Sequence, residues 1–151
     1  MKANIKKWIL GCFLVLSICF SVHSQDMYKQ GAGIRGGFLG GVTYKHFLEF
    51  AGAVEGILGF NFRNGRVVTL TGLYEHHFFL NYQTNFFAGG GLTFGANSDD
   101  FRIIAEGIVG IEYLVPRFPV SFTFDYKPAF HIFGPQFFPD EFALSVRYII
   151  Q

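Results

Sequence analysis

Apolar and polar residues alternate one by one through much of the last thirty residues of the chain. Successive side chains of a β-strand point to opposite faces, so the pattern predicts two strands, each with one apolar face. In the second strand, Glu141, Ala143, Ser145 and Arg147 form the opposite face. The apolar faces hold Val120, Phe122, Phe124 and Tyr126 in the first run and Phe142, Leu144, Val146, Tyr148 and Ile150 in the second.

The first 24 residues have the organisation of a secretory signal peptide. Three lysines precede an apolar segment at 8–20, and residues 22–24 supply a cleavage site, which predicts a mature chain that begins at Gln25. The apolar segment has thirteen residues, fewer than the roughly 20 that a spanning helix needs. With a signal sequence ahead of them, the aromatic strand faces indicate lipid outside a barrel and a charged lumen inside it.

Residues 25–151 are expected to form one domain. Both cysteines, Cys12 and Cys19, fall in the signal segment, which excludes disulfides and cysteine metal sites from the mature chain. The mature chain keeps nine of the twelve Lys/Arg and all eleven Asp/Glu, and has no basic patch, so no nucleic-acid partner is expected. High apolarity without a run long enough for a transmembrane helix is typical of a transmembrane β-barrel.

Turn signals divide the mature chain into eight expected strands. Ten residues at about 3.3 Å each, tilted by about 45°, cross roughly 23 Å, which is close to the apolar thickness of an outer membrane. The first two segments could instead form one bent strand, but an even strand number is usual in bacterial barrels and favours eight. The expected strands are 30–38, 41–47, 53–62, 66–79, 84–95, 101–115, 120–133 and 141–150.

Two kinds of residue predict local departures from regular strands. Pro128 lies inside the seventh segment and cannot donate to a strand ladder, so a β-bulge is expected there. The glycines at 89–91, 107 and 110 are expected where a small, strongly curved barrel bends or where strands approach closely.

When the alternation is carried through each strand, the inward face is strongly charged. An eight-stranded barrel is only wide enough inside for its own side chains, and charges buried there must be paired. The favoured interpretation is a salt-bridge network that plugs the lumen, and the alternatives are a proton or ion path or a set of catalytic carboxylates. The expected inward set has five acids and four bases: Arg35, Lys45, Glu55, Glu75, Glu106, Glu112, Asp125, Lys127 and Arg147.

The histidines are expected at the two rims. His46, His76 and His77 fall near one rim and His131 lies inward near the other. Adjacent residues of a strand point to opposite faces, which argues against a shared metal site at 76–77, so these side chains are assigned to the interfacial aromatic girdle. No metal site is predicted.

Catalytic residues are not predicted either. A lipid hydrolase of the outer membrane needs a Ser–His pair near the outer rim. Ser98 falls in a turn, Ser121 and Ser145 face the lumen, and no serine stands at strand spacing from a rim histidine. The chain also lacks a Gly-x-Ser-x-Gly elbow and any cofactor motif. We therefore expect a protein that is not an enzyme and binds no cofactor.

Three segments carry a family resemblance: VEGILGF at 54–60, DYKPAF at 125–130 and ALSVRY at 143–148. With them, essentially the whole mature chain resembles the small outer-membrane β-barrel proteins of diderm bacteria, which are porin-like. The resemblance implies an all-β, eight-stranded, antiparallel up-and-down transmembrane barrel in the bacterial outer membrane. It implies outer-membrane lipids and the barrel-insertion machinery as partners. Such barrels commonly end in an aromatic residue, whereas this chain ends in Tyr148-Ile149-Ile150-Gln151.

These observations lead to one favoured function and two alternatives. The favoured function is a non-enzymatic outer-membrane barrel with a charge-plugged lumen and a role in envelope structure or surface interaction. The first alternative is a lipid-modifying enzyme of the outer membrane. The second is a secreted, lipocalin-like barrel, which would place the phenylalanine-rich faces inside and the charged faces in water.

Overall fold

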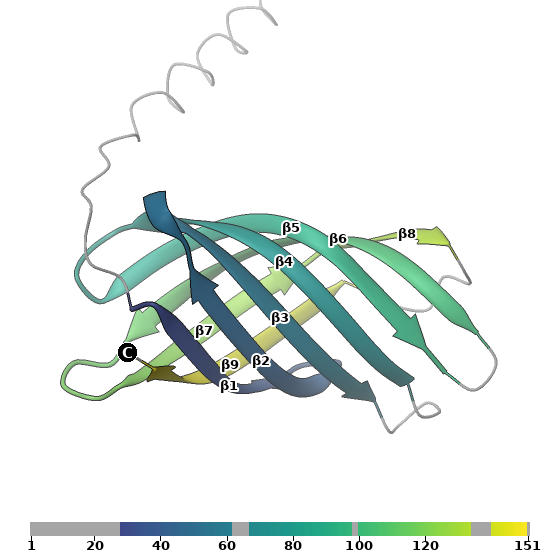
Figure 1. The fold of residues 1–151 in the computed structure, drawn as a ribbon, viewed down its shortest axis with the longest axis horizontal. Coiled ribbons are helices and arrows are strands. Elements are labelled where there is room, and N and C mark those ends of the chain that lie inside the picture. Colours follow the sequence, from purple (N-terminus) through teal and green to yellow (C-terminus); the bar gives the residue numbers. More distant parts are fainter. Residues whose placement is uncertain (1–27, 62–66, 98–99, 134–139, 151) are drawn as a thin grey trace, which may run out of the picture.

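The computed structural model describes residues 28–61, 67–97, 100–133 and 140–150. The expected signal peptide and the expected turns at 63–65 and 98–99 therefore lie outside the described residues. Antiparallel β-strands dominate the rest (Figure 1). The strands are β1 (Gln30–Gly36), β2 (Gly40–Phe47), β3 (Gly52–Asn61), β4 (Val67–Phe79), β5 (Thr84–Ala96), β6 (Phe101–Leu114), β7 (Val120–Lys127), β8 (Ala129–Phe133) and β9 (Glu141–Ile150).

The strands close into an eight-stranded barrel. Each pairs with its neighbour from β1 to β6, β6 pairs with both β7 and β8, and β7 pairs with β9, which returns to β1. Because β7 and β8 lie in succession along β6, they count as one wall strand. The prediction of eight antiparallel strands is confirmed. The first hairpin, which the sequence left open, is two separate strands, β1 and β2.

A short 3₁₀ helix, η1 (Glu49–Ala51), joins β2 to β3. It contains two non-glycine residues in the left-handed region, Phe50 and Ala51. Within the residues that the structure describes, no helix is long and apolar enough to cross a membrane.

The prediction of a bulge at Pro128 is wrong about its position. The register of β6 runs unchanged across this residue, from Val109 opposite Tyr126 to Glu106 opposite Ala129. Pro128 only lacks a donor, and its carbonyl still accepts a hydrogen bond from the Gly107 N–H at 3.0 Å. The register shift comes later, where Ile104 pairs with His131 but Ile103 pairs with Phe133.

Pro128 does mark a change on the other side of the wall strand. Pairing with β9 ends at Lys127 and Glu141. The next N–H that points to that side, from Ala129, donates to a side-chain oxygen of Asp140 at 3.1 Å. The same carboxylate accepts a hydrogen bond from the Tyr126 hydroxyl at 2.5 Å. Asp140 thus replaces a strand partner at the point where β9 begins.

The strands are staggered around the barrel. Following paired residues once around the wall from Val120 leads back to Phe130, ten residues further along the same wall strand. A stagger of this kind is what tilts the strands of a closed barrel against its axis. It also brings inward residues from distant strands to one height. Gly89 and Gly91 of β5 allow a close approach to β4, because a Cβ at either position would lie about 2 Å from a backbone carbonyl oxygen of β4.

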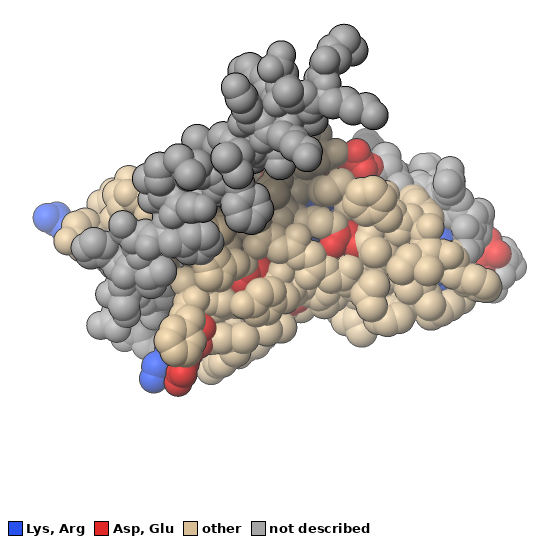
Figure 2. All heavy atoms as spheres, turned by 90° about the horizontal axis from the view of Figure 1, so that it is seen from above, with Lys and Arg blue, Asp and Glu red and all other residues tan. Residues whose placement is uncertain are grey.

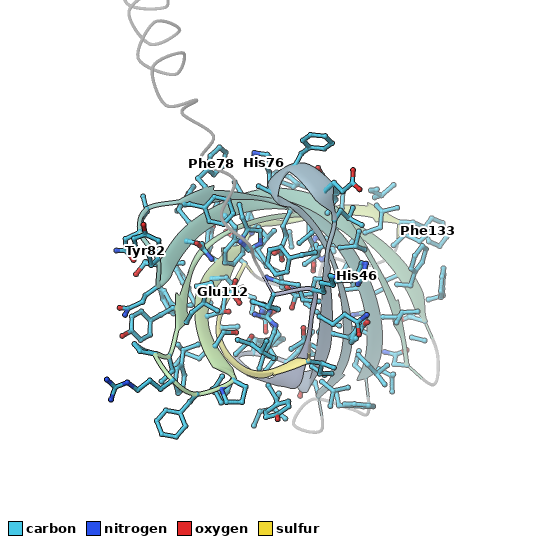
Figure 3. All side chains as sticks on the ribbon, turned by 60° about the vertical axis from the view of Figure 1, so that its left-hand side comes forward. His46, His76, Phe78, Tyr82, Glu112 and Phe133 are labelled. Carbon is cyan, nitrogen blue, oxygen red and sulfur yellow. The ribbon has the colours of Figure 1, made fainter. Side chains whose placement is uncertain are left out.

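The two faces of the wall differ in charge, although apolar side chains such as Ile57, Leu73 and Phe87 also point inward. In the described strands, each Asp, Glu, Lys and Arg side chain is buried in the interior, while exposed aromatic and aliphatic side chains form the outside. Along its length the outer surface is mostly uncharged, and charged side chains protrude toward its ends (Figure 2). Figure 3 shows Phe78, Tyr82 and Phe133 outside the ring of strands and Glu112 within it. This orientation excludes the lipocalin-like alternative, which required the reverse.

Candidate functional site

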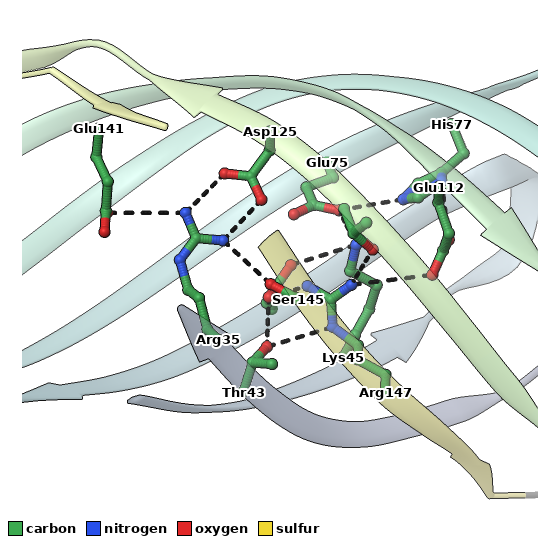
Figure 4. A network of polar contacts seen from close by, with 12 residues as sticks. Arg35, Thr43, Lys45, Glu75, His77, Glu112, Asp125, Glu141, Ser145 and Arg147 are labelled. Atoms are coloured by element: carbon green, nitrogen blue, oxygen red, sulfur yellow. Dashed lines mark hydrogen bonds and ion pairs between the residues drawn. The ribbon is translucent and has the colours of Figure 1, made fainter. Parts of the chain in front are cut away.

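The charged interior is the candidate site, and it divides along the barrel axis. We call the end where β1 begins and β9 ends the near end, at the left of Figure 1, and the opposite end the far end. The near cluster consists of Lys45, Glu55, Glu75, Glu112 and Arg147. The far cluster consists of Arg35, Glu106, Asp125, Lys127 and Glu141. Figure 4 shows most of both clusters and the contacts that cross the lumen.

The near cluster joins strands that are not neighbours in the wall. Arg147 of β9 forms an ion pair with Glu55 of β3, although β1 and β2 lie between those strands. Its second nitrogen lies 3.9 Å from Glu112 of β6. Lys45 of β2 lies 2.6 Å from Glu75 of β4 and 3.2 Å from Glu55. All five side chains are fully buried, so this cluster ties opposite walls together across the lumen.

Hydroxyl groups complete the near cluster. Arg147 donates to Thr123 at 2.6 Å and to Thr43 at 3.4 Å, and Thr43 in turn donates to Glu55. The nitrogen of Lys45 lies 4.5 Å from the centroid of the Phe87 ring, which adds a cation–π contact. A buried charge needs such partners, since each group has lost its hydration.

An aromatic stack lies beside the near cluster. His77 is fully buried, with Nε2 3.1 Å from Glu75 and Nδ1 3.9 Å from Glu112. Its ring stacks on Phe87 and meets the edge of Phe47, and the Phe47 ring meets the edge of Tyr28. The assignment of His77 to the rim girdle is therefore wrong: at position 77 the alternation of β4 turns the side chain inward. His76, the adjacent residue, is half-buried.

Tyr28 precedes the first strand and belongs to the site. Its hydroxyl donates to Glu112 at 2.6 Å. Burial, followed by the negative charge of Glu112, raises the pKa of the Tyr28 hydroxyl well above its ordinary value, so the group stays protonated and remains a donor. The strand alternation gave no signal for this residue, because it lies outside the strands.

The far cluster is built on a two-pronged ion pair. Arg35 of β1 donates to both oxygens of Asp125 of β7, at 2.6 and 2.7 Å, and lies 3.7 Å from Glu141. Lys127 lies 3.0 Å from Glu106 and 3.2 Å from Glu141. Glu141 also accepts the backbone N–H of Leu39 at 3.0 Å. Parallel hydrogen bonds of this type between arginine and a carboxylate are among the strongest in proteins.

All nine residues expected in the lumen have their side chains there, five in the near cluster and four in the far cluster. The expected set was incomplete. Glu141 is a sixth interior acid, and Arg102, which lies 3.7 Å from Asp100 near the far end, is a fifth interior base. The alternation of their strands places both residues inward, so the sequence contained the signal.

Neither cluster forms a metal site. Among the residues that the structure describes, no three His, Cys, Asp or Glu side chains are arranged to hold a metal ion. Ser121 and Ser145 are buried inside the barrel, and Ser145 lies 3.5 Å from Arg35. The arrangement can hold strands together and fill the interior with paired charges.

Comparison with known proteins gives a fold and no family. No family model matches the chain, and no curated protein matches it. Among solved structures, the chain is similar to the N-terminal β-barrel domain of OprF from Pseudomonas aeruginosa. The match has a TM-score of 0.63 at 16% sequence identity and covers 82% of this chain and 98% of the OprF domain. The chain thus has the fold of a porin-like, eight-stranded antiparallel β-barrel.

Proposed function

We propose that this protein is a non-enzymatic, integral barrel of the bacterial outer membrane whose lumen is closed by its own paired charges. One observation carries the proposal: the described strands bury all their Asp, Glu, Lys and Arg side chains inside and present aromatic and aliphatic side chains outside. In water this arrangement would expose a large apolar surface. In a bilayer the apolar wall faces hydrocarbon, and barrel closure leaves few backbone groups without a partner.

The exposed aromatic residues support this placement. Exposed aromatic residues lie toward both ends. Tyr74, Tyr82 and Tyr148 lie toward the near end with Phe50 and Phe118, and Phe101 and Phe133 lie toward the far end. Aromatic residues at both ends of an apolar band are the usual arrangement at membrane interfaces. Outer-membrane lipids and, during biogenesis, the barrel-insertion machinery are the partners that this proposal requires.

Closure of the lumen is supported by contacts that run across it. Arg147 and Glu55 join β9 to β3, and Arg35 and Asp125 join β1 to β7. The interior of an eight-stranded barrel is about as wide as its side chains can fill. A barrel closed in this way would serve envelope structure or surface interaction rather than the passage of solutes.

Three measurements test the proposal: envelope fractionation with a gel shift, planar-bilayer recording and lipid profiles. After envelope fractionation, the full chain is expected in the outer-membrane fraction and to shift on a gel only after heating, as a folded barrel does. In planar bilayers the folded protein is expected to give no stable conductance steps. Recovery as a soluble protein contradicts membrane residence, and large stable conductance steps contradict the closed lumen. Unchanged lipid profiles after deletion of the gene would support the absence of a lipid-modifying activity, and altered acylation would contradict it.

A further inference from the structure

Tyr28 occupies the near mouth of the barrel. It precedes β1, yet its ring lies edge-on to Phe47 at a centroid distance of 4.7 Å, and Phe47 is an inward residue at the end of β2. The hydroxyl reaches further, to Glu112 of β6. The chain leading into the barrel thus turns an aromatic side chain back into the lumen.

The start of β1 leaves room for this ring. A Cβ at Gly31 would lie only 3.0 Å from the Cε2 atom of Tyr28. A distance this short is tighter than most real Cβ contacts, so a larger residue at position 31 would make the ring shift by a few tenths of an ångström. Glycine at this position leaves room for Tyr28 to lie against the strand.

The carboxylate behind Tyr28 has no cation in close contact. Glu112, the carboxylate that Tyr28 contacts, has its nearest cation, Arg147, at 3.9 Å. A second oxygen of Glu112 has no hydrogen-bond partner among the described residues. A mouth lined with one sign of charge attracts the opposite sign and repels the same sign.

We propose that Tyr28 is a stopper that closes the near mouth of the lumen, and that its withdrawal opens a vestibule that admits small cations as far as Glu112. The inference rests on the proposed function, because it assumes that the lumen is otherwise closed. It assigns the closure of one end to a residue outside the barrel wall. The near cluster behind the vestibule stays intact when Tyr28 leaves.

A thiol placed beside the Tyr28 hydroxyl reports on the position of that side chain. Ser121, the second residue of β7, is fully buried and faces inward near Arg147, its partner in the register with β9. The experiment uses the folded full chain with Cys12→Ser, Cys19→Ser and Ser121→Cys, in detergent micelles. The measured quantity is the rate at which the thiol reacts with a trimethylammonium thiosulfonate, and with a sulfonate thiosulfonate of similar size.

The rate is expected to be low with Tyr28 present. Tyr28→Ala removes the ring and a hydrogen bond to a charged group, so the cationic reagent is expected to react faster by about tenfold or more. The anionic reagent is expected to gain less. Tyr28→Phe keeps the ring and is expected to react at a rate between those of the parent and Tyr28→Ala. Tyr44→Ala is the matched control, because Tyr44 is exposed on the outer face of β2, and it is expected to leave the rate unchanged.

Three results would contradict the proposal that Tyr28 closes the near mouth. They are an unchanged rate in Tyr28→Ala when the heat-dependent gel shift shows a folded barrel, an equal rise in Tyr44→Ala, and a larger gain for the anionic reagent. If Tyr28→Ala does not fold, Tyr28→Phe, which loses only the hydrogen bond to Glu112, decides the matter, and an unchanged rate there overturns the proposal too. Rapid labelling in the parent protein would contradict the closed lumen rather than the role of Tyr28 alone.

Discussion

The near and far clusters contain the same charges in different surroundings. Each has two cations and three carboxylates. In the near cluster all five side chains are fully buried, whereas in the far cluster Glu106 and Glu141 keep 8% and 7% of their side-chain surface exposed. Water therefore screens the far cluster more, and the near cluster interacts in a lower dielectric.

The two clusters also differ in hydrogen bonding. Five polar atoms of the near cluster and its neighbour His77 lack a hydrogen-bond partner among the described residues, against one atom of the far cluster, Arg35 Nε. The five are Lys45 Nζ, Glu55 Oε2, Glu75 Oε1, Glu112 Oε2 and His77 Nδ1. In the far cluster, Arg35 and Asp125 make two parallel hydrogen bonds. The near cluster thus leaves more of its buried polar atoms dependent on charge attraction, although Arg147 and Thr43 also donate hydrogen bonds within it. The comparison predicts that equal composition does not give equal sensitivity to mutation.

The largest expected effect comes from removing a cation of the near cluster. Arg147→Met leaves Glu55 and Glu112 buried beside fewer cations, so the free energy of unfolding is expected to fall by about 3–5 kcal/mol. Lys127→Met is the counterpart in the far cluster, with an expected loss of about 1.5–3 kcal/mol. Urea titration of the folded barrel in lipid vesicles, read by the gel shift, gives both values. Equal losses would contradict the difference between the clusters.

Next in size is the ion pair at the centre of the far cluster. Asp125→Asn keeps the shape of the side chain but removes the charge that faces Arg35, and an expected loss of about 1.5–3 kcal/mol follows from the weakened hydrogen bonds. Ser145→Ala is the control, because its contact with Arg35 is long, at 3.5 Å, and its removal should change stability by about 0.5 kcal/mol or less. The same urea titration measures both. A loss in Asp125→Asn as large as that of Arg147→Met would show that the far cluster contributes as much to stability as the near cluster.

A smaller effect is expected from the third carboxyl group of the near cluster. Glu75→Gln retains the side-chain shape and removes one of three buried carboxyl groups, and Lys45 keeps Glu55 at 3.2 Å. Stability is expected to change by about 1 kcal/mol or less in either direction. Glu55→Gln, which removes the charge that faces both Lys45 and Arg147, is expected to cost more. If Glu75→Gln proves the more damaging of the two, Glu75 is the central carboxylate of the cluster instead.

The smallest effect is local and lies at the far end. The hydroxyl of Tyr126, followed by the N–H of Ala129, lowers the pKa of Asp140. The contribution of Asp140 is therefore complete above the ordinary carboxyl pKa and is lost as pH falls through the lowered value. Asp140→Ala is expected to speed hydrogen exchange at the Ala129 N–H and leave exchange in β3 and β4 unchanged. Equal exchange at Ala129 in the parent protein and in Asp140→Ala would show that Asp140 does not act as a substitute strand partner.

Most of the wall was predictable from the sequence because a period of two is a strong signal. The expected and observed bounds of the strands differ by two residues at most, apart from the break at Pro128. The alternation also turns each charged strand residue to the correct face, including Glu141 and Arg102, which the expected set omitted. The polarity of one strand face can therefore be predicted from that strand alone, without knowing which strands lie beside it.

What the sequence could not supply depends on contacts between distant residues. The register shift near Ile132 depends on how β6 and β8 pair, and proline alone pointed to the wrong residue. The division into two clusters depends on the stagger of the strands, which sets the height at which Arg147 meets Glu55. Tyr28 lies before the first strand, where no alternation exists to place it.

The most direct test of the central claim uses two tryptophans in a chain whose only native one, Trp8, is replaced by phenylalanine. Phe124→Trp lies on the exposed outer face, and Phe87→Trp lies in the fully buried interior. In vesicles of brominated lipid, fluorescence quenching is expected for Phe124→Trp and not for Phe87→Trp, and aqueous iodide is expected to quench neither. Quenching of Phe87→Trp by iodide would show an open lumen, and failure of brominated lipid to quench Phe124→Trp would contradict a wall that faces lipid.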